Sequence, residues 1–174
     1  IWFRRYSSSN VPGTFQSVTN IAGEQRSPTI AVDSIDNVAV VWFDEVTSAY
    51  MLRTFNNANT PYTAAIVLRD ISGTAEADHP PTVTYLSGNR FVVTYHLNEP
   101  DTHDPNTFAV MARIFTANGT LVGQEIPVNT QLLSTQARMD VSATNDGGFI
   151  VAFVDNSLGP RAISIRAFDA LGVA

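Results

Sequence analysis

The chain of 174 residues contains no cysteine and no lysine. The first absence excludes disulfides and thiolate metal sites, and the second excludes catalysis by a lysine amine. All ten basic residues are therefore arginines, and sixteen acidic residues give the chain a net charge of −6. Because phosphate contacts need clustered cations, this charge balance excludes nucleic acid as an expected partner.

Long apolar runs and helical periodicity are also missing from the sequence. No segment approaches the roughly 18 apolar residues that a membrane-spanning helix needs, so no membrane span is expected. No secretory signal is visible, and the first residues are Ile-Trp-Phe rather than a methionine. We therefore expect a mature or excised part of a longer protein.

The most informative feature that is present is a short arginine–aromatic motif, which occurs four times. In each copy an arginine stands two residues before an aromatic residue, and a turn-forming run follows. The four pairs are Arg4 and Tyr6, Arg53 and Phe55, Arg113 and Phe115, and Arg166 and Phe168. The copies recur at intervals of about fifty residues, which indicates a repeat architecture.

A constant order of strand-like segments surrounds each motif. A strand and a tight turn are followed by a very apolar strand, a variable loop, the arginine–aromatic strand, another turn and a short strand. The predicted strands cover residues 2–6, 15–19, 28–33, 38–43, 51–55, 65–68, 81–85, 91–96, 109–115, 125–128, 139–143, 149–154 and 163–168.

Four antiparallel strands per repeat are the make-up of a propeller blade. The predicted fold is therefore all-β, with four-stranded antiparallel blade-like repeats that form a β-propeller or part of one. Residues 1–174 are predicted to be a single repeat domain. Its units cover about 1–20 (partial), 21–70, 71–130 and 131–174 (partial).

The second strands of the repeats are apolar on both faces, as in Val38–Trp42, Phe91–Tyr95 and Phe149–Phe153. A strand that is buried on both faces reads as a continuous apolar run. We therefore expect the repeats to stack face to face, with neighbouring repeats covering both sides of each second strand.

Two parts of the sequence resemble a repeat found in very large bacterial surface and secreted proteins. They are GGFIVAF with ISIRAFDALG, and PTVTYLSGNRFVVTYHLNEPD with VMARIFTANGTLVGQEIPVNT. In that family such repeats often stand beside RTX-type calcium-binding or cadherin-like modules. Residues 139–172 and 81–130 match best, whereas residues 21–70 depart at Ile35–Val38 and at Asn59. The resemblance implies a propeller-like architecture and a secreted or cell-surface location, and it implies no activity.

The repeated arginines admit two interpretations. A ring of guanidinium groups would bind a carboxylate or a phosphate. Alternatively, each arginine lies on its neighbouring aromatic ring and caps a loop carbonyl or an aspartate of the next unit. Recurrence in every repeat favours the second interpretation, because repeats reuse interface residues.

The segment 98–107 is longer than its counterparts in the other units and is rich in oxygen ligands. Its candidate calcium ligands are Asp101, Asp104 and Asn106, since closely spaced carboxylate and amide oxygens suit a hard cation. The spacing is not that of an EF-hand, and two prolines also suit an ordinary rigid loop. His103 in the same segment is a candidate ligand-binding residue.

Trp42 and Tyr95 end two of the apolar strands at equivalent positions. As exposed rings they would form a platform for a sugar, whereas at the end of a buried strand they would belong to the core. Both interpretations remain open, and the two residues join His103 as candidates for ligand binding.

The sequence carries no nucleophile-elbow, zincin or P-loop motif. Together with the repeats, the acidic composition and the extracellular context that the resemblance implies, this absence favours a non-enzymatic extracellular repeat module for adhesion, matrix or surface-assembly interactions. The expected partners are a protein or glycan at a surface, and neighbouring repeats or identical subunits. The alternatives are a lectin-like glycan-binding propeller and a fragment of a propeller hydrolase. Calcium is the one candidate cofactor.

Overall fold

The computed structural model describes residues 1–70, 80–97, 109–130, 136–158 and 161–174. These residues form thirteen strands and one short 3-10 helix. The elements are β1 (Trp2–Tyr6), β2 (Pro12–Ser17), β3 (Gln25–Val32), β4 (Val38–Asp44), β5 (Ala49–Phe55), β6 (Ile66–Asp70), β7 (Thr82–Leu86), β8 (Arg90–Leu97), β9 (Ala109–Thr116), β10 (Leu121–Pro127), β11 (Gln136–Ala143), β12 (Phe149–Asp155), η1 (Asn156–Leu158) and β13 (Ala162–Phe168). Every predicted strand is present, with ends displaced by a few residues, and η1 has no counterpart among the predictions. Within the described ranges, no helix is long and apolar enough to cross a membrane.

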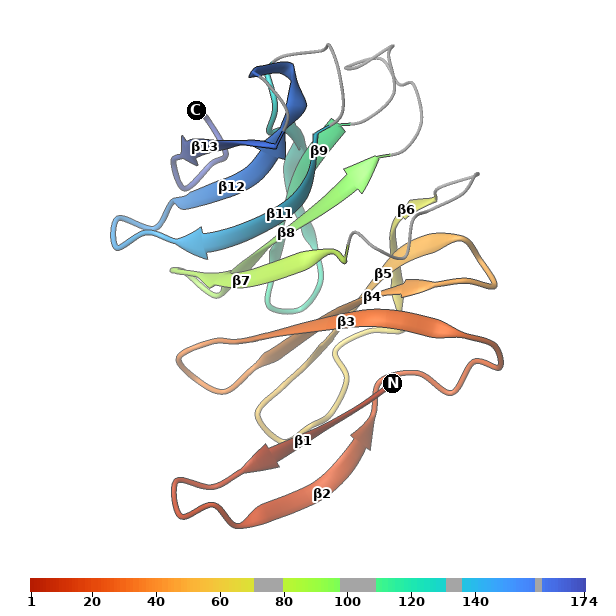
Figure 1. Ribbon diagram of the computed structural model, residues 1–174. Helices are drawn as coiled ribbons and strands as arrows, with labels where there is room; N and C mark the ends of the chain where they lie inside the picture. The colour runs from red at the N-terminus through yellow and green to blue at the C-terminus, as the bar shows by residue number, and fades with distance from the viewer. Residues whose placement is uncertain (71–79, 98–108, 131–135, 159–160) are drawn as a thin grey trace.

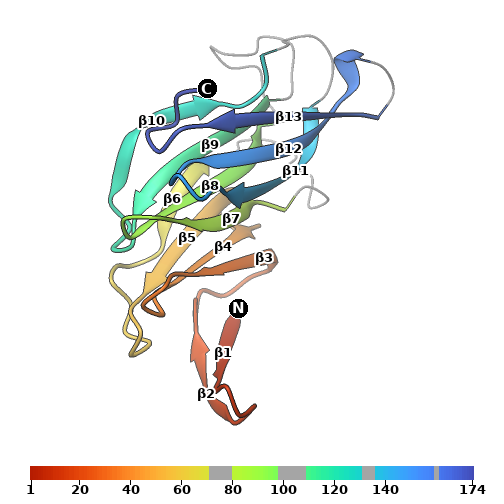
Figure 2. The same cartoon turned by 90° about the vertical axis from the view of Figure 1, so that its left-hand side faces the viewer.

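The described strands build four antiparallel sheets that follow one another along the chain. Sheet 1 contains β1 and β2, sheet 2 contains β3 to β6, sheet 3 contains β7 to β10, and sheet 4 contains β11 to β13. Figure 1 shows them stacked from the β1–β2 hairpin at the bottom to β13 at the top, and Figure 2 shows the same stack from another side. The predicted all-β fold class, with four-stranded antiparallel blade-like sheets, is confirmed.

The strand register places corresponding residues of the repeats at corresponding positions. Trp42 lies opposite Met51 in sheet 2, and Tyr95 lies opposite Met111 in sheet 3. The arginine–aromatic motif lies on the third strand of sheets 2, 3 and 4, and on β1 of sheet 1. Sheet 1 therefore corresponds to the third and fourth strands of a blade, and sheet 4 corresponds to the first three.

The core lies between the sheets. Each sheet has a backward face, toward the sheet before it in the chain, and a forward face, toward the sheet after it. Sheet 3 presents Tyr95 and Met111 backward to sheet 2, and Val92 and Ile114 forward to sheet 4. β4 is buried along its whole length, as predicted for a second strand with neighbours on both sides. Burial of each such side chain contributes about 1.5–3 kcal/mol, so these contacts hold the stack together.

The prediction that Phe149–Phe153 is buried on both faces is wrong. The backward-facing residues of β12 are buried, but Ile150 on its forward face is exposed. On the neighbouring strand β13, Ile163 and Ile165 are 66% and 70% exposed. The physical reason is that no described sheet follows sheet 4, so nothing in the described chain covers its forward face.

Each third strand ends in the same five-residue turn. The amide of the first residue donates to the carbonyl of the fifth, and the amide of the fourth donates to the carbonyl of the first. The fourth residue has a positive φ in every copy, and these residues are Asn10, Asn59, Gly119 and Gly172. Glycine and asparagine adopt this left-handed conformation most readily, which explains the turn-forming run after each motif.

Candidate functional site

The arginine of each third strand reaches back to the sheet before it. In each case the Nη1 group donates to a backbone carbonyl that lies in, or directly after, the fourth strand of the preceding sheet. The pairs are Arg53 with Val18 at 2.6 Å, Arg113 with Leu68 at 2.5 Å, and Arg166 with Val128 at 2.9 Å. The motif thus fastens neighbouring sheets together.

Two of these arginines lie over the aromatic ring of their own motif, as predicted. The guanidinium carbon of Arg53 is 5.4 Å from the centre of the Phe55 ring, and that of Arg166 is 5.1 Å from the centre of the Phe168 ring. The predicted acceptor is wrong in one respect, because it belongs to the preceding unit rather than to the next one. The reason is that the arginine stands on the backward face of its strand.

A second contact ties Arg53 and Arg113 to the end of their own sheets. Arg53 Nε donates to the Thr63 carbonyl at 3.3 Å, just before β6. Arg113 Nε lies 3.3 Å from Oε1 of Glu125 on β10. One planar guanidinium therefore serves two sheets at once, which the single nitrogen of a lysine cannot do in the same geometry.

The arginines at the two ends of the molecule each make only one of these two contacts. Arg4 Nε donates to the Gly13 carbonyl of its own sheet at 2.7 Å, but no described sheet precedes sheet 1. Arg166 reaches back to sheet 3, but no described fourth strand lies beside β13. A groove of 390 Å³ lies beside Arg166 and is lined by Ile126 and Phe168 among others.

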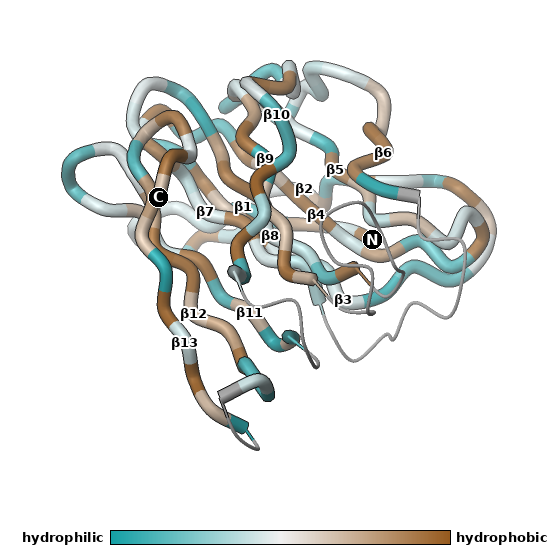
Figure 3. The backbone as a smooth tube through the Cα atoms, turned by 90° about the horizontal axis from the view of Figure 1, so that it is seen from above, coloured by the Kyte–Doolittle hydropathy of each residue, from teal (hydrophilic) through white to brown (hydrophobic). Residues whose placement is uncertain are grey.

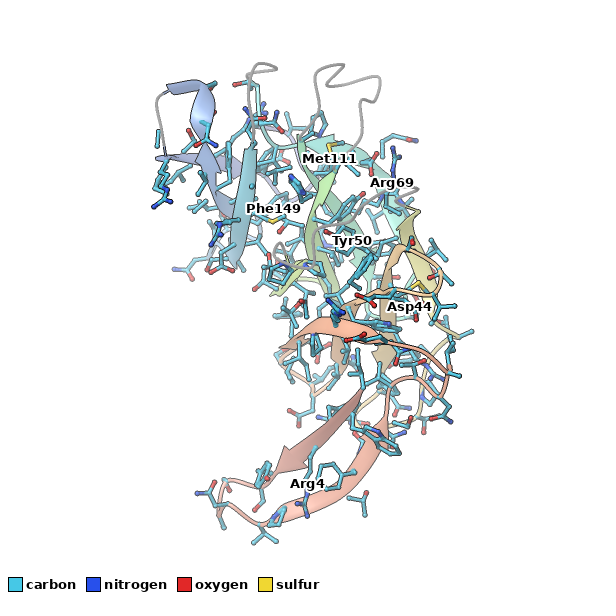
Figure 4. The ribbon with its side chains drawn as sticks, turned by 45° about the vertical axis from the view of Figure 1, so that its right-hand side comes forward. Arg4, Asp44, Tyr50, Arg69, Met111 and Phe149 are labelled. Carbon is cyan, nitrogen blue, oxygen red and sulfur yellow. The ribbon has the colours of Figure 1, made fainter. Side chains whose placement is uncertain are left out.

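The backward side of sheet 1 is an exposed aromatic surface, which we name the N-terminal face. It consists of Trp2, Arg4, Tyr6 and Phe15. The Arg4 guanidinium carbon lies 4.7 Å from the centre of the Phe15 ring. In sheet 3 the residues equivalent to the first and third members, Met111 and Phe115, are buried. Figure 4 shows Arg4 on the β1–β2 hairpin at one extreme of the molecule.

The forward side of sheet 4 is an exposed aliphatic surface, which we name the C-terminal face. It consists of Ile150, Ile163 and Ile165. In sheet 3 the residues equivalent to the last two, Val110 and Ala112, have no exposed surface. Figure 3 shows hydrophobic residues recurring along β12 and β13 at this edge of the molecule. Both ends of the stack therefore expose positions that are core in its middle.

A cluster of charged side chains joins sheets 2 and 3. Glu125 pairs with Arg113 and also lies 3.6 Å from Arg69 Nη1, and it accepts a hydrogen bond from the buried phenol of Tyr95. Burial first, and then the negative charge of Glu125, raise the pKa of Tyr95 far above the ordinary value of 10.0. Because the carboxylate already has three partners, the cluster is an inter-sheet contact rather than an open site.

Two buried aspartates that sequence reasoning missed end the second strands of sheets 2 and 4. Asp44 lies opposite Gln25, and Asp155 lies opposite Gln136. Burial raises the pKa of Asp155, but hydrogen bonds from Ser157 and Gln136 outweigh it and hold the pKa below its usual value. The recurrence of aspartate in VWFD and AFVD was the signal for this pair of positions.

Trp42 and Tyr95, two of the candidate ligand-binding residues, have no exposed surface. Trp42 packs in the core between sheets 1 and 2, and Tyr95 packs in the core between sheets 2 and 3. The structure therefore places both side chains in the interior, and a ligand-binding role for them stays a prediction.

The other predicted site residues lie outside the described residues: Asp101, Asp104, Asn106 and His103. Calcium binding by the first three stays a prediction. Across the ranges that the structure describes, no three acidic or histidine side chains gather in a way that would hold a metal ion.

The comparisons with known proteins give similarity to solved structures alone. No family model and no curated protein sequence matches the chain. Among solved structures, the chain is similar to the GH43 endo-arabinanase from Bacillus licheniformis, with a TM-score of 0.47 and 13% sequence identity. The similarity covers 92% of this chain and 62% of the arabinanase, so the chain spans less than two thirds of that protein.

Proposed function

We propose that this chain is a non-enzymatic assembly module of a secreted or cell-surface structure, in which copies join head to tail through their two end faces. The supporting observation is the exposure of Ile163 and Ile165, at positions where sheet 3 has fully buried residues. A contiguous apolar face of this kind marks an interaction surface. The occupant we propose for each face is a second copy of this chain.

The two end faces are the two halves of one interface that the chain already uses internally. At each internal boundary, a forward face meets a backward face that carries the arginine–aromatic motif. The C-terminal face is such a forward face, and the N-terminal face is such a backward face. Different surfaces of two copies would therefore meet, which is a heterologous contact that builds rings or filaments. Adhesion or matrix formation is the kind of role that such an assembly would serve.

Sedimentation velocity over a range of protein concentrations tests this proposal. The wild-type chain is expected to associate, and Ile165→Asp and Tyr6→Asp should each weaken association about tenfold or more, because each buries a charge in one half of the contact. Val67→Asp is a matched control, since Val67 is an exposed valine on β6 and belongs to neither end face.

A mixing experiment separates head-to-tail contact from other modes. Tyr6→Asp leaves the C-terminal face intact, and Ile165→Asp leaves the N-terminal face intact. An equal mixture of the two variants should therefore form one-to-one dimers that grow no further. A wild-type chain that stays monomeric at about 0.5 mM, or a mixture that forms no dimer, would contradict the proposal.

A further inference from the structure

A neutral groove opens at the boundary between sheets 2 and 3, where tight turns of the two sheets meet. It has a volume of 440 Å³, within the range of small-molecule sites, and it lies away from both end faces. Its lining includes Ile35, Tyr62, Asn89, Thr116 and Asn118. None of the lining residues carries a charge. The groove is thus lined by amides, hydroxyls and one aromatic ring.

The groove exists because a short side chain stands where the boundary between sheets 3 and 4 has an arginine. Between sheets 3 and 4, Arg90 Nη1 donates to the Ala170 carbonyl at 2.6 Å and closes the boundary. Arg90 directly precedes the first core residue of its second strand, and the equivalent residue of sheet 2 is Asn37. Asn37 Nδ2 donates within its own sheet, to Asp33 Oδ2 at 2.7 Å. It therefore does not bridge to sheet 3 as Arg90 bridges to sheet 4.

The boundary between sheets 1 and 2 is also closed by an arginine. Arg5 Nε donates to Asn59 Oδ1 at 2.5 Å, and Arg5 Nη2 donates to the Asp36 carbonyl at 2.7 Å. Of the three described boundaries, the one between sheets 2 and 3 is thus the one at which no arginine bridges the turns. An uncharged site at that single boundary is a specific feature of this chain rather than a by-product of the repeat.

The aromatic ring in the groove is held in a fixed position while remaining accessible. Tyr62 is 43% exposed, yet its phenol donates to Asn37 Oδ1 at 3.1 Å. Asn37 is itself buried and bonded to buried Asp33. The backbone amide of Tyr62 donates to the Thr54 carbonyl at 3.0 Å. A ring anchored at both ends binds a flat partner at little entropic cost, because its rotamer is already chosen.

Two side-chain amides beside this ring provide hydrogen-bond donors. Asn118 Oδ1 accepts hydrogen bonds from the Thr116 and Thr120 hydroxyls, which orients the amide and leaves its Nδ2 group as the outward donor. The Asn89 side chain is exposed beside it. A backbone hydrogen bond from Ala117 N to the Asn89 carbonyl, at 2.7 Å, holds the two turns of sheet 3 together beside the groove.

We propose that this groove binds a neutral oligosaccharide. The C–H face of a sugar ring would pack on Tyr62, and its hydroxyls would bond to Asn118 and Asn89, since amides both donate and accept. The absence of charge among the lining residues selects against acidic sugars. This inference does not depend on head-to-tail assembly, because the groove is internal to one copy.

Side-chain amide NMR on the 174-residue chain tests the proposal, with cellotetraose, maltotetraose and mannotetraose as neutral probes and trigalacturonate as the acidic comparator. At least one neutral probe should give saturable shifts at Asn89 and Asn118. Asn118→Asp should weaken that binding about tenfold, because it keeps the turn's acceptor oxygen but removes the donor. Asn57→Asp is the matched control, since it places the same charge on an exposed turn of sheet 2 outside the groove.

Two tyrosine variants separate stacking from folding. Tyr62→Phe keeps the ring and should retain most of the affinity, whereas Tyr62→Ser should lose about tenfold or more. If Tyr62→Ser lowers the melting temperature, its loss of affinity does not separate stacking from folding. The comparison of Asn118→Asp with Asn57→Asp then decides. The proposal is overturned if no neutral probe shifts these amides at about 10 mM, if trigalacturonate binds more tightly, or if Asn118→Asp and Asn57→Asp have equal effects.

Discussion

Arg53 and Arg113 show why this chain uses arginine at every motif. In each guanidinium, Nη1 donates to a backbone carbonyl of the preceding sheet and Nε contacts an oxygen of its own sheet. The distances lie between 2.5 and 3.3 Å. Five donors in a rigid plane allow both contacts at once. The absence of lysine from the whole sequence is consistent with the same geometric demand.

The two most deeply buried tyrosines should lower the free energy of unfolding at alkaline pH. Burial raises the pKa of Tyr50 far above 10.0, and burial together with the Glu125 charge does the same for Tyr95. Above pH 10 the unfolded chain loses these protons while the folded chain keeps them. The folded state therefore binds more protons, and its stability is full below about pH 10 and falls as the pH rises.

We expect the free energy of unfolding to fall by about 1.4 kcal/mol per pH unit for each of these two tyrosines above about pH 10. Urea denaturation between pH 8 and pH 11.5 measures this slope. Tyr95→Phe and Tyr50→Phe should each remove about half of it, after allowance for their effect at pH 8. A slope that the double variant leaves unchanged would show that other groups control alkaline unfolding.

The five-residue turn after each third strand depends on its fourth residue. At Gly119 the backbone φ is +84°, and an added Cβ would lie 2.7 Å from Ile66 Cδ1 of sheet 2. Gly123 on β10 has a similar φ of +74°, but an added Cβ there would meet nothing within 4 Å. The two glycines share the conformational requirement, and only the first also packs against a neighbouring sheet.

Alanine at either glycine should destabilise the chain, by about 1–2 kcal/mol at Gly123 from backbone strain alone. Gly119→Ala should lower the free energy of unfolding by more than Gly123→Ala does, because the Ile66 side chain must also move. Thermal unfolding of the two variants side by side measures the difference. Equal losses would mean that the contact between the turn and sheet 2 contributes nothing to stability.

The strands were predictable because their signals are local. Alternating and continuous apolar runs fixed the places of β4, β8 and β12, and the repeated turn residues fixed their order. The direction of the Arg53 contact was not predictable, since it depends on which face of the strand the preceding sheet covers. For the same reason, the open forward face of β12 left no trace in the sequence of Phe149–Phe153.

The candidate sites were less predictable than the fold. Trp42 and Tyr95 stood out as aromatics, but burial is a property of the stack and not of the residue. The sequence could not bring Tyr62 and Asn118 together in one groove, because they come from turns of different sheets that only the folded chain places side by side. Their chemistry is that of ordinary turn residues until they share a surface.

At the scale of the whole molecule, the middle of the stack is covered on both sides and the ends are not. β4 and β9 are paired on both edges and almost completely buried, whereas β1 and β13 each have one free edge among the described strands. The free energy of local opening should therefore be highest in the middle of the stack and lowest at its two ends.

Hydrogen exchange followed by mass spectrometry should show this gradient directly. We expect the slowest exchange in peptides that cover β4, β5, β8 and β9, and faster exchange in those that cover β1 and β13. Raising the protein concentration into the associating range should slow exchange in β1 and β13 without changing the middle. Uniform slowing throughout the chain would contradict assembly through the end faces.

The motif arginines bond to residues that precede them in the chain, and this determines the order in which donor and acceptor are synthesised. The carbonyl that Arg53 requires belongs to a residue 35 positions earlier, and for Arg113 and Arg166 the separations are 45 and 38. On a ribosome the acceptor is thus always made before its donor. Each sheet, as it emerges, therefore meets a preceding sheet whose acceptor carbonyl has already been made.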